Sequence, residues 1–338
     1  MQRVLLTGAS GFIGYHLVRR LLEENCVLRC LVRSSSATEQ LRPFGVEFCH
    51  GDISEPDTLG RAVAGCDTIF HLAGRVRAKN LPQFLETNRD GTRNLARAAA
   101  AQPNPPTFVH VSTLAVMGPS KNGVPKRETD HPQPISHYGI SKLEGERILQ
   151  SFAAEMPCSV IRPGVVFGEW DRMNFELFKA VRNFGFMPNP GWTSRYYSWI
   201  HAADLAELAV LTARRGNRLF CGSGDVEPSD RGIYFASVGN GFNLDEIGRE
   251  IGRSLGRKRT MTIKTPPVGV WVVASYFELL KRTTGKPQPY DWAKAHESFH
   301  NWCGSPEKAE AELSFTPLTT ITERFDQTTR WYRENGWL

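Results

Sequence analysis

The stretch Val4-Leu5-Leu6-Thr7-Gly8-Ala9-Ser10-Gly11-Phe12-Ile13-Gly14 decides the fold of this chain. An apolar run ends at Thr7, three glycines follow at spacings of three, and a helical pattern opens directly afterwards. Gly8 permits a tight turn, Gly11 lets the backbone approach a pyrophosphate, and Gly14 lets the helix pack close to the strand. The same glycines would suit a tight turn without a ligand. The flanking strand and helix favour a dinucleotide site, because the start of a helix presents free N–H groups and a positive dipole end to phosphates.

The composition is that of an ordinary globular protein. The 338 residues include 41% hydrophobic and 22% charged residues, which suffices for a large core and two domains. The net charge is +6, but Lys and Arg are scattered, so no nucleic-acid partner is expected. The seven cysteines form no Cys-x-x-Cys pair and no secretory segment precedes the first strand. Reduced thiols in a cytoplasmic protein are therefore expected.

Apolar runs alternate with helical patterns through the first half of the chain. Further strands are expected at residues 26–32, 46–53, 68–74, 107–112 and 157–163. Helices are expected at 81–101 and, capped by Ser136, at 136–154. Helices between strands imply βα crossovers, so we predict an α/β fold with a doubly wound, parallel Rossmann sheet.

The alternation loosens after Gly168. Short strands are expected at 198–201, 234–238 and 261–264, with helices at 175–184, 203–213, 244–255, 268–282, 306–313 and 319–335. We predict a dinucleotide-binding domain at residues 1–165, to which 198–217 return. A smaller C-terminal α/β substrate lobe is predicted at 166–197 and 218–338. The Gly- and Pro-rich segment 118–134 is expected to form a loop over the site.

The second strand ends at Arg33, which three serines follow. In this fold the end of the second strand meets the adenosine ribose, where an acidic side chain binds the 2′-hydroxyl and an arginine accommodates a 2′-phosphate. No Asp or Glu stands there, so NADP is favoured as the cofactor, while NAD stays open. A surface arginine at a strand end is the simpler alternative.

The segment Tyr138-Gly139-Ile140-Ser141-Lys142 places a phenol and an ammonium on one face of the capped helix. A neighbouring cation favours the phenolate, which makes proton exchange with a substrate alcohol feasible. Thr113 follows the fifth strand, where the ligands of such sheets bind, and its hydroxyl could hydrogen-bond the substrate oxygen. By itself the tyrosine–lysine spacing is common, and an exposed tyrosine beside a lysine is the plain alternative.

With these motifs in place, the chain resembles the extended short-chain dehydrogenases/reductases, and most of all their dihydroflavonol reductase and 3-beta-hydroxysteroid dehydrogenase-like branch. The matching segments follow the family's order over nearly the whole chain: residues 7–14, 51–53, 71–74, 88–94, 111–118, 138–142, 162–168 and 331–337. The resemblance is specific for the family and not for the substrate.

The resemblance implies roles for particular residues. Tyr138 would be the catalytic acid/base, Lys142 would bind the nicotinamide ribose and lower the pKa of that tyrosine, and Thr113 would replace the family's usual serine, with Ser112 as the fallback. The implied cofactor contacts are Gly8, Ser10, Gly11, Phe12, Ile13, Gly14, Arg33, Asp52, Ile53, Ala73, Ser112, Tyr138, Lys142, Pro163 and Val165. The family commonly dimerises through the helices at 81–101 and 136–154, so a homodimer is expected. No metal is expected, because His71, His110 and His137 lack metal-like spacing.

These observations predict an NAD(P)-dependent oxidoreductase that acts on a ketone or secondary alcohol. The main alternative is a nucleotide-sugar epimerase or dehydratase on the same scaffold. Residues 163–165 and 195–201 lack the polar groups that the nucleotide-sugar enzymes of the family usually carry there. A third alternative, a cofactor-binding regulatory module, conflicts with the intact set of Tyr138, Lys142 and Thr113.

Residues 268–277 are apolar on every face of a helix and too short to span a bilayer. They could form a core helix, contact a partner or lipid headgroups, or wall a pocket beside Phe184, Phe186 and Trp192. A pocket wall would suit a bulky apolar substrate such as a sterol-like or polyketide-like ring.

Overall fold

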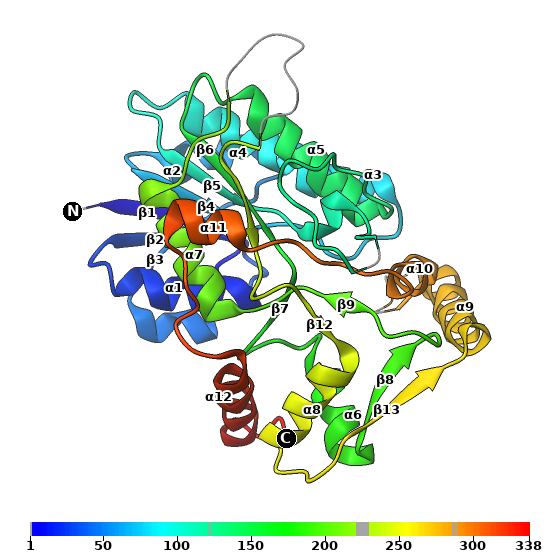
Figure 1. The fold of residues 1–338 in the computed structure, drawn as a ribbon. Helices are drawn as coiled ribbons and strands as arrows, with labels where there is room; N and C mark the ends of the chain where they lie inside the picture. Colours follow the sequence, from blue (N-terminus) through cyan, green and yellow to red (C-terminus); the bar gives the residue numbers. More distant parts are fainter. Residues whose placement is uncertain (1, 122, 221–229, 286–287, 289) are drawn as a thin grey trace.

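A seven-stranded parallel sheet forms the centre of the molecule (Figure 1). The computed structural model describes residues 2–121, 123–220, 230–285, 288 and 290–338. The strands follow the order β11-β6-β5-β4-β1-β2-β3, so the chain winds outward from β1 in both directions. Their bounds are β1 (Arg3–Thr7), β2 (Val27–Val32), β3 (Glu47–His50), β4 (Thr68–His71), β5 (Thr107–Val111), β6 (Cys158–Pro163) and β11 (Ile233–Ala236). This order confirms the predicted doubly wound fold.

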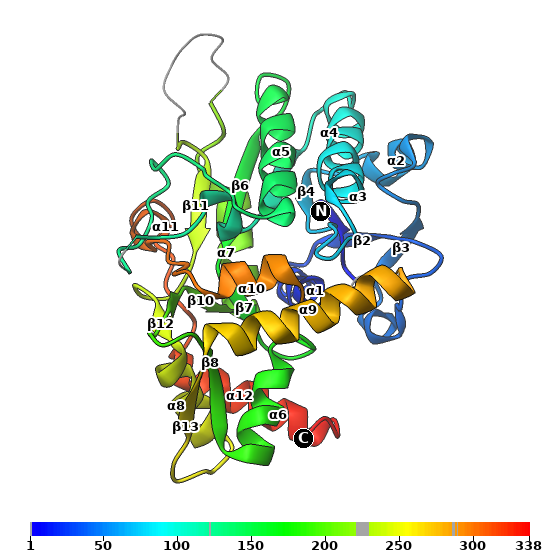
Figure 2. The ribbon, with the colours of Figure 1, turned by 90° about the vertical axis from the view of Figure 1, so that its right-hand side faces the viewer.

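Helices cover both faces of the sheet (Figures 1 and 2). One face packs against α1 (Phe12–Leu22), α7 (Ala202–Arg215) and α11 (Glu307–Leu313). The other packs against α2 (Pro56–Val63), α4 (Gly91–Ala100) and α5 (His137–Ser151). Each interface is a separate apolar core, and the strands between them are buried on both sides, as in other parallel sheets.

Two predicted helices carry local detail that positions the site. The helix expected at 81–101 is α3 (Leu81–Leu85), a π-helical turn at Glu86–Asp90, and α4. Ser136 caps α5 as expected, since its Oγ accepts a hydrogen bond from the Gly139 N–H at 3.2 Å. The loop expected at 118–134 contains no regular element among its described residues and begins just after a 3₁₀ turn at Leu114–Met117.

The smaller part of the molecule is built from strand pairs and helices below the sheet in Figure 1. The pairs are β7 (Val165–Phe167) with β10 (Trp199–His201), β8 (Phe186–Pro190) with β13 (Met261–Thr265), and β9 (Tyr196–Tyr197) with β12 (Phe242–Asn243). The helices are α6 (Phe175–Phe184), α8 (Leu244–Ser254), α9 (Pro267–Thr284), α10 (Trp292–Ser298) and α12 (Ile321–Glu334). An aromatic core that includes Phe167, Phe178 and Phe325 holds α6 and α12 against β7 and β10.

One strand lies elsewhere than expected. The strand predicted at 234–238, within the range assigned to the smaller lobe, is β11 and forms the edge of the central sheet. Tyr234, Phe235 and Ala236 are all buried, and β11 pairs in parallel with β6. Burial on both faces of this short apolar run explains its place in the sheet.

The interpretation of α9 as a core helix is wrong. Within its length only Val270 and Ala274 are buried. Phe184 and Trp192, expected beside a pocket wall, are also exposed. In the part of the chain that the structure describes, no helix is long and apolar enough to cross a membrane.

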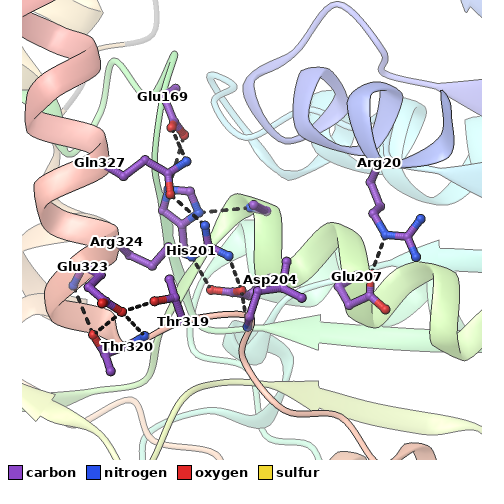
Figure 3. A network of polar contacts seen from close by, with 12 residues as sticks. Arg20, Glu169, His201, Asp204, Glu207, Thr319, Thr320, Glu323, Arg324 and Gln327 are labelled. Carbon is purple, nitrogen blue, oxygen red and sulfur yellow. Dashed lines mark hydrogen bonds and ion pairs between the residues drawn. The ribbon is translucent and has the colours of Figure 1, made fainter. Parts of the chain in front are cut away.

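Buried polar contacts join α12 to the rest of the molecule (Figure 3). Arg324 on α12 donates two hydrogen bonds to the Asp204 carboxylate on α7, at 3.0 and 2.5 Å. Gln327 donates from Nε2 to Glu169 Oε1 at 2.6 Å. If α12 moved away from α7, the buried charges of Arg324 and Asp204 would lose their partners, which is energetically costly. This pair therefore holds α12 against α7.

Candidate active site

The glycine turn brings β1, α1 and the end of β4 into close contact. Gly8 has a φ of +76°, and a Cβ there would lie 2.8 Å from the Ala73 nitrogen. A Cβ on Gly14 would lie 2.2 Å from the Gly8 oxygen. Both positions therefore exclude any larger side chain, and Gly14 acts as the packing glycine that the sequence indicated.

A cleft of about 490 Å³ opens at the carboxyl ends of β1 to β4. Seven of the residues implied as cofactor contacts line it: Gly8, Ser10, Gly11, Arg33, Asp52, Ile53 and Ala73. The other eight residues of the implied set do not line it: Phe12, Ile13, Gly14, Ser112, Tyr138, Lys142, Pro163 and Val165. The cleft also includes polar residues that were not assigned to the cofactor, among them Ser36, Ser54, Arg75, Arg77 and Thr87.

Arg33 and Asp52 face each other at one end of this cleft. The Arg33 side chain is 64% exposed, and its Nε lies 4.0 Å from Asp52 Oδ2. The Asp52 carboxylate accepts hydrogen bonds from the backbone N–H and the hydroxyl of Ser54, both at 2.9 Å. This end of the cleft therefore presents the exposed guanidinium of Arg33 and the Asp52 carboxylate, which Ser54 holds in place.

A second cavity, of about 420 Å³, lies beside Tyr138. Four residues of the implied site line it: Thr113, Tyr138, Pro163 and Val165. The remaining walls are Leu114, Ala115, Gly164, Asn174, Leu177, Tyr197, Tyr290, Lys294, Glu297, Ser298 and Trp302. The helix α10 supplies three of them, and the sequence analysis did not predict this helix. The Asp291 N-cap, which accepts from the Lys294 N–H at 3.1 Å, was the available signal.

Burial sets the protonation state of Tyr138. It raises the pKa of the phenol to about 12, the Thr113 hydroxyl opposes this, and the Glu297 carboxylate adds to it. The phenol is therefore protonated at neutral pH. The resemblance implied that Lys142 lowers this pKa, but Lys142 is not among the groups that shift it in the structure.

Lys142 is fully buried behind the tyrosine. Its Nζ donates to the Val111 carbonyl at 2.8 Å and lies 3.3 Å from His110 Nε2. Burial lowers the pKa of Lys142 to about 8, while Glu146 opposes the shift. Deprotonation of the Lys142 ammonium therefore costs less free energy than that of an exposed lysine. The Val111 carbonyl oxygen holds this ammonium at the end of β5.

The histidines near the site have structural partners. His71 Nδ1 lies 2.7 Å from Thr7 Oγ1, and its Nε2 lies 3.0 Å from Thr92 Oγ1. These contacts tie β4 to β1 and α4. Among the described residues, no group of three or more His, Cys, Asp or Glu side chains could hold a metal ion.

Comparison with known proteins identifies the family. Residues 4–222 match the NAD dependent epimerase/dehydratase family. The chain belongs to this family. It is 31% identical to the ceramide reductase of Caulobacter vibrioides over 99% of this chain and 96% of that protein. It is 28% identical to the N-acetyl-alpha-D-glucosaminyl-diphospho-ditrans,octacis-undecaprenol 4-epimerase of Escherichia coli O157:H7, over 84% of this chain and 81% of that protein.

A solved structure has the same fold. The UDP-glucose 4-epimerase of Thermotoga maritima superposes with a TM-score of 0.76 at 20% identity, covering 99% of each chain. At this identity the likeness shows the fold alone. The relatives thus include both a reductase and an epimerase, and the family that this chain matches is described as NAD dependent.

Proposed function

We propose that this protein is an NADP(H)-dependent oxidoreductase that interconverts a bulky apolar ketone and the corresponding secondary alcohol. The observation that carries the proposal is the cavity beside Tyr138: the Tyr138 and Thr113 side chains line a wall that is otherwise mostly apolar. A relative that spans nearly the whole chain is named a ceramide reductase, which agrees with a reductase of an apolar substrate.

The residues present fit a nicotinamide dinucleotide. Gly8 and Gly14 leave no room for side chains beneath the cleft, and the N-terminus of α1 opens into it. The hydroxyl oxygen of Ser112 is buried without a hydrogen-bond partner among the described residues. A dinucleotide would lie along this cleft with Arg33 near its adenosine end, and when bound it supplies the hydride.

The side chains around the cavity would handle the proton. The protonated Tyr138 phenol donates to the carbonyl oxygen in the reductive direction, and the Thr113 hydroxyl hydrogen-bonds the same oxygen as negative charge develops there. Lys142 supports this arrangement from behind, because its ammonium is anchored on the Val111 carbonyl.

The cavity's composition supports an apolar substrate. Leu114, Leu177 and Trp302 contribute apolar surface. The two charged residues in the walls, Lys294 and Glu297, form an ion pair in which Lys294 Nζ lies 2.6 Å from Glu297 Oε2. Each substrate CH₂ buried here would contribute about 0.8 kcal/mol, or roughly fourfold in kcat/KM.

The test is a series of cyclic ketones of increasing size, assayed with NADPH by loss of its absorbance. We expect kcat/KM to climb with apolar size. Equal turnover of small polar ketones would contradict the proposed substrate class. The epimerase alternative is tested by thermal shift with UDP-, GDP- and dTDP-sugars, since residues 163–165 and 195–201 depart from the segments that those enzymes usually carry there; a clear rise in Tm would favour it.

A further inference from the structure

The helix α9 presents an apolar row to the outside of the molecule. Val268, Val272, Tyr276 and Leu279 follow one another at spacings of three and four, and their side chains are between 59% and 70% exposed. Trp271 lies beside this row and is also exposed. A helix on the surface of a globular protein normally turns its apolar side chains inward. The outward apolar row of α9 therefore indicates that another surface covers this face.

Two charged groups of α9, Glu278 and Lys281, are turned toward the protein instead. Lys281 Nζ lies 3.5 Å from Glu278 Oε2 and 3.3 Å from Asp291 Oδ2, and all three side chains are largely covered. The helix therefore pairs Glu278 and Lys281 on the inner side, leaves the apolar row outside, and exposes the Arg282 side chain at the edge of that row. This reverses the arrangement that water favours.

Aromatic and cationic groups border the apolar row. The Arg282 guanidinium lies 5.2 Å from the centre of the Trp292 ring on α10. Lys264, just before α9, and Lys79, next to its end at Gly285, are exposed cations. Trp, Tyr and Arg beside an apolar helix face are typical of segments that lie in the headgroup region of a bilayer, and cations favour anionic lipids.

The face also adjoins the candidate site. The helix α10 packs on α9 through Ala295, which is buried with Val270 and Ala274, while Lys294 and Glu297 line the substrate cavity. Figure 2 shows α9 and α10 side by side across the front of the molecule. Whatever covers α9 therefore lies against the pair of helices, α9 and α10, of which α10 lines this cavity.

We propose that the outer face of α9, together with Trp292, binds the surface of an anionic lipid bilayer and places the substrate cavity at its boundary with water. A second copy of the chain fits this face less well. A symmetric pair would bring the cations Lys264 and Arg282 of each copy against the same cationic rim of the other. The inference concerns membrane binding and does not depend on the proposed reaction.

The experiment is co-sedimentation of the whole protein with phosphatidylcholine vesicles and with phosphatidylcholine–phosphatidylglycerol vesicles, without substrate. The wild type should bind the anionic vesicles, and added salt should weaken binding. The double substitution Val272→Asp with Leu279→Asp should reduce partitioning by about tenfold or more, since it places two charges in the apolar row. The matched control is Leu318→Asp, at an equally exposed leucine between α11 and α12, which should bind as the wild type does.

Calorimetric titration of cofactor shows whether the double variant keeps its fold. Absence of vesicle binding by the wild type would overturn the proposal, as would a folded double variant that binds as well as the wild type. Sedimentation velocity measures the oligomeric state and so tests whether a second copy of the chain covers this face instead. A wild-type dimer that the double substitution abolishes, together with no vesicle binding, would assign the face to a second copy. Failure to find a ketone substrate would leave these results unchanged.

Discussion

Tyr138 is the residue on which the proposed chemistry depends. Its ring packs 6.2 Å from Phe84, and the hydroxyl is held protonated by burial. Tyr138→Phe removes the proton donor and keeps the ring. We expect kcat and kcat/KM to fall together by about 10²- to 10⁴-fold, with cofactor affinity nearly unchanged. Steady-state kinetics and cofactor titration measure both quantities.

The same cavity offers a matched control for this variant. Tyr197 also lines the cavity, but its hydroxyl donates to the Ser298 carbonyl at 3.3 Å. Tyr197→Phe removes an equal hydroxyl from a different wall and should keep most of the turnover. A loss as large as that of Tyr138→Phe would mean that the proton donor has been misassigned.

At the same scale, the proposed cofactor preference rests on Arg33. Its exposed guanidinium can reach a 2′-phosphate, and replacing it disturbs no buried contact. We expect the wild type to bind NADPH more tightly than NADH. Arg33→Asp should shift the ratio of the two Kd values by roughly 10- to 100-fold toward NADH, the size of a lost charged hydrogen bond plus repulsion. Calorimetry with both cofactors measures the ratio; equal or tighter binding of NADH by the wild type would refute the preference.

At the scale of elements, the sequence predicted what is local. The strand–glycine–helix unit and the Ser136 cap show in the sequence because their partners lie within a few residues. The helix α10 has a cap signal at Asp291, but its position over Tyr138 depends on packing between segments about 150 residues apart in the chain, which no local pattern encodes. The candidate site was therefore predictable on the side of β1, β5 and α5, and not on the side of α10.

Two further elements show the same limit. The run that forms β11 was recognisable as a strand, yet its pairing with β6 joins residues some 70 positions apart. In α9 the apolar residues lie on every face, so periodicity could not distinguish a core helix from an exposed one. The inward orientation of Glu278 and Lys281 decides the question, and it is a property of tertiary structure.

At the scale of the whole molecule, buried histidines make stability depend on pH. Burial lowers the pKa of His16 to about 4 and of His71 to about 3, and it lowers that of His110 well below its usual value. In the unfolded chain these groups titrate near pH ~6.5. Below that pH the unfolded state binds more protons than the folded state, so the free energy of unfolding falls as pH falls. The loss begins near pH ~6.5 and continues down to about pH 4, at a slope of up to roughly 4 kcal/mol per pH unit if all three groups contribute fully.

Thermal unfolding followed by circular dichroism between about pH 7.5 and pH 4.5 measures this loss of stability. His16→Gln should reduce the difference in bound protons between the unfolded and the folded chain by up to one, which makes the pH dependence of stability shallower. The substitution also removes the contact of His16 Nε2 with the Glu169 carbonyl at 3.0 Å, so Tm falls at all pH values. His137→Gln, at an exposed position, is the control and should leave the slope unchanged. A Tm that stays constant from neutral pH down to about 5 would show that these histidines are not buried in the neutral form.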